Sequence, residues 1–566
     1  MKIDALLFLQ RSDITHHARA GRDQAHLPLL FIDPGLAEYA IDQGLDPDRF
    51  SYRPLSVGPH FQARIAEEAT TRAAAIDQEL CRERERLFGP HVLAGWDHEP
   101  MRLFFMRALV ARDLGAVCDR TFPEARIGLY RPSNPQLFYF DSYLSTDLFV
   151  GASTRWHLAA EYEGAAHWRA DHSDHCFDFA EVARAASAGA QAVTHIPTCY
   201  WHHEQFSRQI TERFVSNIDL PSAFWDIPIR RTGSMLCPID ALPSDHISDR
   251  ARAYRDVAGR IFDQHLGQLA LGREALHRQS DALAARSFVQ AINYEGLIDA
   301  LRGSRPHLVV TDHDTGSNGP LFSVAARLGS SITVLPHASY PAFTLPHAMR
   351  VQAIERDGFA TPVRSAWGQR VATRSVQLGS RASPVARTRV QTVCLVLNTL
   401  SSQGISHIDL AGAARFHMAL KQLCQQHGVQ LLVRLKPNAA GVMMASPAFG
   451  LAATALQAVL DTPLADLAAR TDLCVAYGEP TTAGYEFLAS GSYLMQANDQ
   501  LWPCDYVISP PLVNDGLVPS FDTASALSHL ASLVSDSDRF AAHAQHQRQD
   551  FCRRLTAADD RIFDTP

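Results

Sequence analysis

The chain has 566 residues, of which 46% are hydrophobic and 20% are charged, a composition typical of folded globular proteins rather than of disordered or fibrous ones. Because single hydrophobic cores stop growing at roughly 250–300 residues, we expect at least two domains. The 52 basic and 60 acidic residues give a net charge of −8, which offers no overall attraction for nucleic acid or anionic lipid.

The cysteines and the N-terminal segment indicate where in the cell the protein is expected. Ten cysteines are scattered from Cys81 to Cys552 without a CxxC pair, which indicates free thiols in a reducing compartment, the cytoplasm. The apolar run at 3–9 soon meets charged residues, so it lacks the features of a signal peptide and predicts a first strand. No apolar stretch approaches the roughly 20 residues that cross a bilayer, so we expect any membrane contact to be peripheral.

The first part of the chain alternates short apolar runs with helical periodicity. Runs at 3–9 and 27–33 predict strands, and 36–45 predicts a helix after the Pro34-Gly35 turn. Residues 61–88 keep apolar side chains on a helical repeat with Arg and Glu on the other face, which predicts a long amphipathic helix.

We interpret the region of about 90–300 as a largely helical insertion in the first domain, holding the acceptor specificity. It is rich in aromatic and histidine residues, with a predicted helix near 101–115 and a strand at 125–132. Apolar residues recur at three- to five-residue intervals between Ser248 and Gly303, which predicts long helices.

Histidines crowd the segments 170–179 and 200–206. Their HxxHC spacing matches no standard zinc site, so we expect no metal and interpret the stretch as a polar or acceptor-site loop.

Residues 307–339 read as an apolar strand, an Asp-, Gly- and Asn-rich loop, a helix, a tight turn and a second apolar strand. Strands that are apolar throughout are typical of a parallel sheet covered on both faces. The polar, basic and proline-broken segment 380–391 then predicts a domain boundary, so that the first domain spans 1–380.

The same alternation restarts after the boundary and defines a second domain, 388–566. The fold class is therefore α/β, with two Rossmann-like doubly wound domains that face a cleft and bind ligands at the carboxyl ends of their strands. The predicted elements are strands at 392–399, 431–437, 472–477 and 492–497, and helices at 408–427, 483–490 and 521–556.

The segment 477–498 carries the densest pattern of candidate residues. A strand ends in a loop with Thr481 and Thr482, and the helix that follows presents backbone N–H groups suited to a phosphate. Glu486 lies one helical turn in. The alternative is that Thr481 only caps the helix and Glu486 faces solvent.

Two further strand ends add polar groups in the second domain. Arg434 and Lys436 emerge at the end of an apolar strand, where positive charge neutralises phosphate, unless they are surface residues only. Asn398 and Thr399 open a polar loop after the first strand of this domain, the place where such folds bind ligands, unless it is an ordinary loop. The loop lacks GxGxxG, which argues against a nicotinamide or flavin cofactor.

In the first domain Asp312 and Asp314 follow a buried strand, and His337 follows the next one. A carboxylate or imidazole there can take a proton from a hydroxyl, and an aspartate can attack as a nucleophile. The alternative is that the aspartates cap a turn and a helix and that His337 belongs to the core. Nothing else in the segment completes a metal-ligand set.

The run from Thr481 through Gly491 resembles the donor-site segment of GT-B glycosyltransferases, in which a small-residue loop precedes a Glu-bearing helix ending in Ala-x-Gly. The resemblance implies that Thr481 and Thr482 contact phosphate and that Glu486 contacts the ribose or sugar. The Arg-x-Lys-Pro strand end resembles bacterial surface-polysaccharide transferases and, more faintly, retaining Kdo transferases.

The resemblance implies transfer of a sugar from a nucleotide-activated donor, CMP-Kdo-type or a UDP- or GDP-hexose, to a glycan or lipid-linked glycan acceptor. The polysaccharide would be a capsule or lipopolysaccharide O-chain. The nucleotide-sugar is then a substrate, and no cofactor is expected. The alternatives are a non-hydrolysing UDP-amino-sugar 2-epimerase and a non-catalytic sugar-binding protein.

Overall fold

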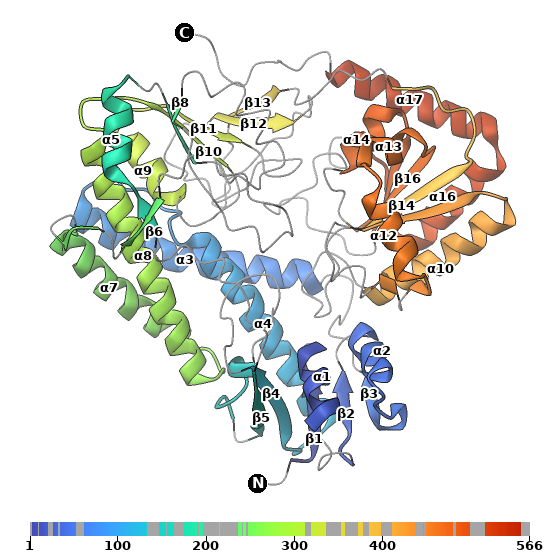
Figure 1. The fold of residues 1–566 in the computed structure, drawn as a ribbon, viewed down its shortest axis with the longest axis horizontal. Helices are drawn as coiled ribbons and strands as arrows, with labels where there is room; N and C mark the ends of the chain where they lie inside the picture. The colour runs from blue at the N-terminus through green and yellow to red at the C-terminus, as the bar shows by residue number, and fades with distance from the viewer. Residues whose placement is uncertain are drawn as a thin grey trace.

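A computed structural model gives the fold (Figure 1). Within its described residues no helix is long and apolar enough to cross a membrane. The described residues are 3–9, 11–20, 26–31, 34–52, 61–132, 146–153, 155–163, 175–189, 192–195, 214–215, 236–239, 242–244, 247–311, 318–335, 352–356, 372–376, 384–397, 410–435, 445–446, 449–478, 483–498 and 516–555.

The first sheet has five parallel strands in the order β3-β2-β1-β4-β5. All four residues of β1 are buried, as expected for a parallel strand covered on both faces. The strands of the first sheet and the helices between them are β1 (Ala5–Phe8), α1 (Arg11–Ala20), β2 (Leu29–Phe31), α2 (Pro34–Asp42), η2 (Pro47–Arg49), β3 (Phe50–Tyr52), β4 (Ile127–Pro132), η3 (Thr146–Leu148) and β5 (Trp156–Tyr162).

The middle sheet has six parallel strands in the order β13-β12-β11-β10-β7-β8. A separate antiparallel pair, β6 (His175–Phe177) with β9 (Leu236–Pro238), is hydrogen-bonded through the Phe177 N–H to Asn293. Its other elements are α5 (Phe179–Ser187), β7 (Ala192–His195), β8 (Phe214–Val215), β10 (His307–Thr311), α9 (Asn318–Leu328), β11 (Ile332–Leu335), β12 (Gln352–Arg356) and β13 (Ala372–Val376).

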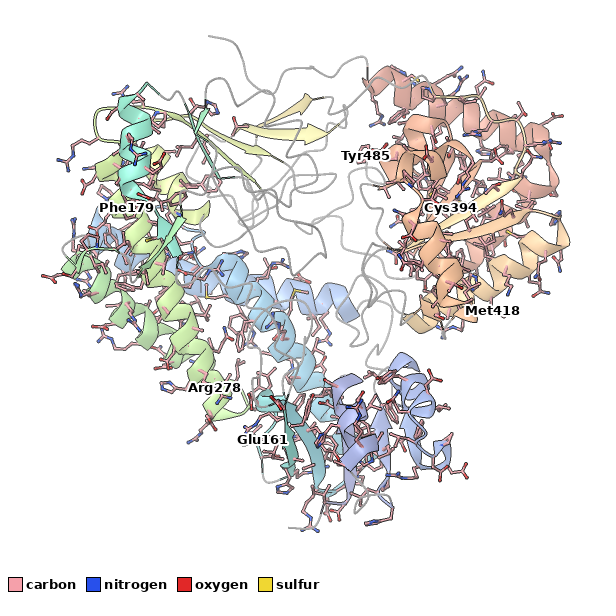
Figure 2. All side chains as sticks on the ribbon, viewed as in Figure 1. Glu161, Phe179, Arg278, Cys394, Met418 and Tyr485 are labelled. Carbon is pink, nitrogen blue, oxygen red and sulfur yellow. The ribbon has the colours of Figure 1, made fainter. Side chains whose placement is uncertain are left out.

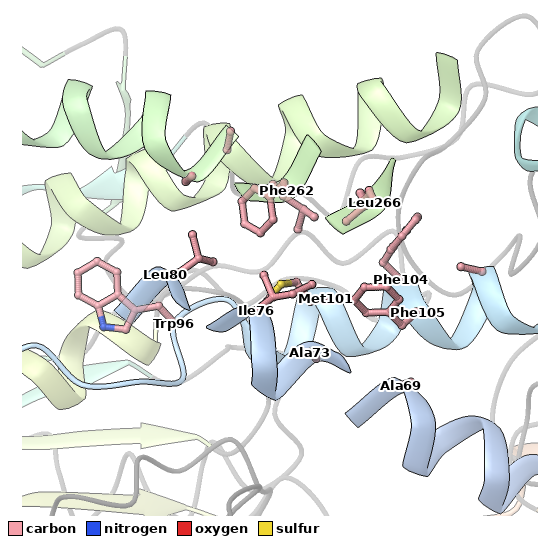
Figure 3. Close-up of a cluster of buried hydrophobic side chains, with 14 of the residues drawn as sticks. Ala69, Ala73, Ile76, Leu80, Trp96, Met101, Phe104, Phe105, Phe262 and Leu266 are labelled. Carbon is pink, nitrogen blue, oxygen red and sulfur yellow. The ribbon is translucent and has the colours of Figure 1, made fainter. Parts of the chain in front are cut away.

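Four long helices join these two sheets: α3 (Phe61–Phe88), α4 (His98–Thr121), α7 (Asp249–Leu266) and α8 (Arg273–Ala300). One hydrophobic cluster runs from Leu7 of the first sheet through these helices to Leu308 of the middle sheet. Figure 3 shows its centre, where side chains of α3 and α4 meet Phe262 of α7. We call these four helices the helical layer, and the two sheets share one core through it.

Fully buried charges lie inside the helical layer. The guanidinium of Arg84 donates to Asp77 at 2.9 Å and to Asp97 at 2.8 Å, and all three side chains have no exposed surface. Arg84 also donates to the hydroxyl of Tyr254 at 3.0 Å and lies over the ring of Trp96. Because Tyr254 belongs to α7, this network ties α3 and the α3–α4 connection to α7.

A second group of charges anchors the first sheet to the helical layer. The buried carboxylate of Asp147 in η3 lies 3.1 Å from Arg131 of β4 and 2.9 Å from Arg278 of α8. Figure 2 labels Arg278, together with Glu161, which pairs with Arg131. Gly272, just before α8, packs so closely on η3 that a Cβ would lie 2.3 Å from the Asp147 carbonyl oxygen.

The third sheet has five parallel strands in the order β15-β14-β16-β17-β18 and two hydrophobic clusters of its own. Its elements are β14 (Thr392–Leu397), α10 (Leu410–Gln426), β15 (Gln430–Arg434), α12 (Ala453–Asp461), α13 (Leu464–Ala469), β16 (Leu473–Tyr477), α14 (Ala483–Ser490), β17 (Tyr493–Ala497), β18 (Ser520–Phe521), α16 (Thr523–Ser535) and α17 (Ser537–Leu555).

The chain that precedes β14 is attached to this third sheet. The backbone N–H of Val385 donates to the Ser490 carbonyl at 3.2 Å. Gly491 has φ +90°, and a Cβ there would lie 2.0 Å from the Val385 carbonyl oxygen. The predicted boundary segment 380–391 therefore lies against the C-terminal sheet from residue 384 on, whereas the division into domains stays a prediction.

The predicted α/β class with doubly wound parallel sheets is confirmed. The structure differs in the number of sheets, because the start of the chain forms a sheet separate from that of β10 and β11. The predicted insertion of about 90–300 contains α4, α7 and α8, and it also supplies β4, β5, β7 and β8 to the two sheets.

Candidate functional site

The C-terminal sheet reverses its direction of winding at β14. From β14 the chain goes to β15 on one side and then crosses to β16 on the other. Leu397, the last residue of β14, is aligned with Tyr477, the last residue of β16. The carboxyl ends of two strands at such a switch point form the usual ligand crevice of doubly wound sheets.

Most of the predicted donor-binding residues lie just beyond these strand ends. Asn398 and Thr399 directly follow β14, and Thr481 and Thr482 lie between β16 and α14; all four are outside the described residues. Their segments nevertheless leave the sheet from neighbouring strands, because β14 and β16 pair directly. The structure thus brings together two strand ends, Leu397 and Tyr477, that are eighty residues apart in the chain.

Gly478 starts the turn that follows β16. Its φ of +81° lies in the left-handed region that favours glycine. Its N–H donates to the Ala497 carbonyl at 2.9 Å, and its carbonyl accepts the side-chain amide of Gln496 at 2.6 Å. Both backbone groups are therefore bound to β17, which fixes where the chain departs toward Thr481.

Glu486 lies in the first turn of α14 and is half-buried. Tyr485 and Phe487 on either side are buried in the hydrophobic cluster between α14 and the sheet, and Figure 2 marks Tyr485. Packing of these two rings fixes the rotation of the helix, and with it the position of the Glu486 carboxylate. An acidic side chain in a first turn is also favourable for the helix dipole.

Arg434 has a structural partner. Its buried guanidinium donates through Nη1 to the carbonyl oxygens of Leu460 at 2.9 Å and Thr462 at 3.0 Å, and also to Val459. These carbonyls end α12, where positive charge is favourable. Burial lowers the pKa of the guanidinium. Donor binding by Arg434 stays a prediction, and Lys436 lies outside the described residues.

The predicted catalytic residues follow adjacent strands of the middle sheet. Thr311, which ends β10, is aligned with Leu335, which ends β11. Asp312 comes directly after β10 and His337 two residues after β11, and these two residues and Asp314 lie outside the described part of the chain. Since β10 also pairs with β7, Asp312 follows a strand at the switch point of this sheet.

The sequence analysis missed a cluster on the first sheet. Asp13, His16 and His17 of α1 meet Tyr130 of β4 and Tyr162 of β5. The signal that could have found it is the S-D-x-x-H-H spacing right after the first strand, which puts acidic and imidazole groups one turn apart on a helix.

In the part of the chain that the structure describes, no group of three or more His, Cys, Asp or Glu side chains is arranged to hold a metal ion. In the HxxHC stretch, Cys176 is a fully buried free thiol of β6.

The fold and these strand ends define a parallel α/β protein with polar segments gathered at the carboxyl edges of its sheets. No family model matches the chain, and no curated protein matches it. It is similar to a solved structure described as a glycotransferase of kitacinnamycin, at 17% identity and TM-score 0.31 over 48% of this chain and 78% of that one. It is also similar to a GtfA/B complex, at 12% identity and TM-score 0.29 over 48% of this chain and 59% of that one. At these TM-scores neither likeness bears on function.

Proposed function

We propose that this chain is a glycosyltransferase of the GT-B kind that moves a sugar from a nucleotide-activated donor to a glycan or lipid-linked glycan acceptor. The setting is cell-surface polysaccharide synthesis, in the cytoplasm or peripherally at the inner membrane. The donor is CMP-Kdo-type or a UDP- or GDP-hexose, used as a substrate without a further cofactor or metal.

One observation carries the proposal: the pairing of β14 with β16 at the switch point of the C-terminal sheet. In the sequence, Asn398 and Thr399 directly follow β14, and Thr481 and Thr482 follow β16 within five residues. Hydroxyl and amide groups together with the N–H groups that begin α14 suit a phosphate. Glu486, one turn into α14, is then the hydrogen-bond acceptor for ribose or sugar hydroxyls.

The acceptor side of the proposal belongs to the middle sheet. Asp312, Asp314 and His337 follow β10 and β11, which pair in parallel and end at the same register. In this proposal one of them takes the proton of the acceptor hydroxyl as its oxygen displaces the nucleotide from the anomeric carbon. When configuration is retained, an aspartate first displaces the nucleotide and the acceptor oxygen then displaces the aspartate.

The donor site is tested by binding. CMP, UDP and GDP are added separately, and one is expected to raise the melting temperature selectively, since a ligand stabilises only the state that binds it. Glu486→Gln is expected to weaken the binding of that nucleotide, or of its sugar conjugate, by about 1–3 kcal/mol, measured by calorimetry. The control is Glu274→Gln, another first-turn glutamate, which lies on α8.

Equal affinities in both variants would reject the assignment of Glu486. The nucleotide affinity of Arg434→Ala is interpreted only together with its melting temperature, because this substitution also removes the hydrogen bonds to α12.

The reaction is tested separately. Asp314→Ala is expected to keep donor affinity and lose turnover, and full residual turnover would remove Asp314 from the mechanism. Conversion of UDP-N-acetylglucosamine to an epimer would identify the epimerase instead. Nucleotide binding with unchanged donor in the presence of crude lipid-linked acceptors would favour a non-catalytic binding protein.

A further inference from the structure

The first sheet has a switch point of its own. Its order is β3-β2-β1-β4-β5, so the chain leaves β1 toward β2 on one side and reaches β4 on the other. Helix α1 begins three residues after β1 ends. The carboxyl ends of β1 and β4 are therefore a third edge of the kind that binds ligands, and the proposed sugar transfer uses neither strand.

Two buried side chains of α1 fix two tyrosines at this edge. The carboxylate of Asp13 accepts the Tyr162 hydroxyl at 2.8 Å and the backbone N–H of Leu9 at 3.2 Å. Nδ1 of His17 lies 2.7 Å from the Tyr130 hydroxyl. Asp13 is completely buried and His17 is 3% exposed, so these contacts are not shared with solvent and hold both tyrosine rings in place.

The two tyrosines in turn hold His16. Its ring is stacked on Tyr162, with centroids 5.0 Å apart, and lies edge-on to Tyr130 at 5.4 Å. His16 is only partly buried, and neither ring nitrogen makes a hydrogen bond within the described part of the chain. The cluster thus holds one imidazole between two tyrosine rings, and the groups beneath it are already hydrogen-bonded to one another.

The charges around His16 favour an uncharged ligand. Burial lowers the pKa of His16, so the ring is neutral near pH 7 and carries one N–H donor and one acceptor nitrogen. Asp13 already places a carboxylate in the first turn of α1, where an anionic ligand would otherwise be favoured. A hydroxyl both donates and accepts, so it matches the donor and the acceptor nitrogen of a neutral imidazole, and a saccharide carries several such groups.

We propose that the carboxyl edge of the first sheet is a second ligand site, in which His16 hydrogen-bonds a hydroxyl group of an uncharged saccharide. Tyr130 and Tyr162 orient the imidazole, and Asp13 and His17 orient the tyrosines. This site lies on a different sheet from the donor and acceptor edges of the proposed transferase and does not depend on that function.

The test uses saturation-transfer NMR on the full chain with maltose, cellobiose and lactose, and with glucose 6-phosphate as an anionic counterpart. At least one neutral disaccharide is expected to receive saturation in preference to the phosphate. His16→Ala is expected to reduce that transfer about fivefold or more, as for loss of a hydrogen bond. His16→Gln, which keeps a donor and an acceptor, is expected to restore part of it.

The matched control is His277→Ala, which removes an exposed histidine of α8 and is expected to leave the transfer unchanged. Melting curves establish that the His16 variants are folded, and the glutamine variant serves if the alanine variant is not. His16→Ala is expected to lower the signal by the same amount in the wild-type and Asp314→Ala backgrounds, which separates this site from the acceptor edge. No transfer to any of the three disaccharides, or equal transfer in His16→Ala and wild type, would overturn the proposal.

Discussion

Arg84 illustrates how single residues hold the helical layer together. Its guanidinium serves Asp77, Asp97 and the Tyr254 hydroxyl, and it has no contact with solvent. Ser287 of α8 adds a hydrogen bond to Asp97 at 2.8 Å. Burying these charges is costly, so the cluster is stable only while each charge keeps its partners.

Replacing Arg84 by methionine leaves two buried carboxylates without their cation, and we expect a loss of about 3–5 kcal/mol in the free energy of unfolding. Arg86→Met is the control on the same helix, because Arg86 pairs with Glu83 at the surface and exposed pairs contribute about 0–1 kcal/mol. Urea unfolding measures both. Similar losses for the two variants would contradict the role given to Arg84.

Two buried histidines give the stability a pH dependence. Burial lowers the pKa of His17 to about 4, with Arg49 and His16 adding to the effect. Burial likewise lowers the pKa of His417, on α10, to about 4, and Lys421 adds to it. Both pKa values lie below the ordinary histidine value of 6.5. Between about pH 4 and pH 6.5 the unfolded chain therefore binds more protons than the folded chain.

Stability contributed by the neutral imidazoles is therefore fully present above about pH 6.5 and is lost as the pH falls toward about 4. We expect wild type to unfold at lower urea concentration at about pH 5 than at about pH 7.5, and His417→Phe to show a smaller difference. His277→Ala is expected to keep the wild-type difference. The same pH dependence in His417→Phe would show that His417 does not contribute.

At the level of elements, α9 links the core to a predicted catalytic segment. The helix begins at Asn318, right after the segment that contains Asp312 and Asp314. Ser323 of α9 accepts the indole N–H of Trp96 at 3.0 Å and the backbone N–H of Leu93 at 2.9 Å. Helix α9 thus packs directly on the connection between α3 and α4.

Gly319 permits this packing. A Cβ at this position would lie 2.6 Å from the Trp96 Cα, and backbone does not yield as a flexible side chain does. We expect Gly319→Ala to cost about 1–3 kcal/mol or more through overpacking. Gly115→Ala is the control: this glycine lies inside α4 with nothing within 4 Å of a Cβ, so alanine is expected to stabilise by about 0.5–1 kcal/mol. Thermal melts of both variants measure the two stability changes, and a stable Gly319→Ala variant would contradict the close packing.

For the whole molecule, the described cores fall into two groups. The first sheet and the middle sheet share a cluster through the helical layer, whereas both clusters of the C-terminal sheet contain only residues from 390 on. The segment from 384 is hydrogen-bonded to that last sheet. The first sheet has a further cluster of its own within residues 3–162, but the cluster that it shares with the helical layer needs α7 and α8.

We therefore expect a fragment of residues 384–566 to fold by itself with a cooperative urea transition, because its core is complete. A fragment of residues 1–162 is the matched comparison and is expected not to unfold cooperatively. Circular dichroism and urea titration of both fragments provide the measurement. A C-terminal fragment without a cooperative transition would contradict the predicted domain boundary.

Several local elements could be predicted from the sequence, although the single helix predicted at 521–556 is two helices, α16 and α17, preceded by β18. The helices predicted at 61–88 and 483–490 have those bounds in the structure, because helical periodicity and end signals are properties of neighbouring residues. It also placed the candidate residues at strand ends, since an apolar run followed by polar residues marks a strand terminus.

Only the tertiary structure decided which strands share a sheet and what the buried polar groups contact. Strands β1 and β4 are more than a hundred residues apart in the chain, and their pairing gives the start of the chain a sheet of its own. The end of α12 lies beside Arg434 and accepts hydrogen bonds from its guanidinium. The cluster around His16 likewise needs α1, β4 and β5 together. Such contacts follow from packing between distant segments, which a local pattern does not encode.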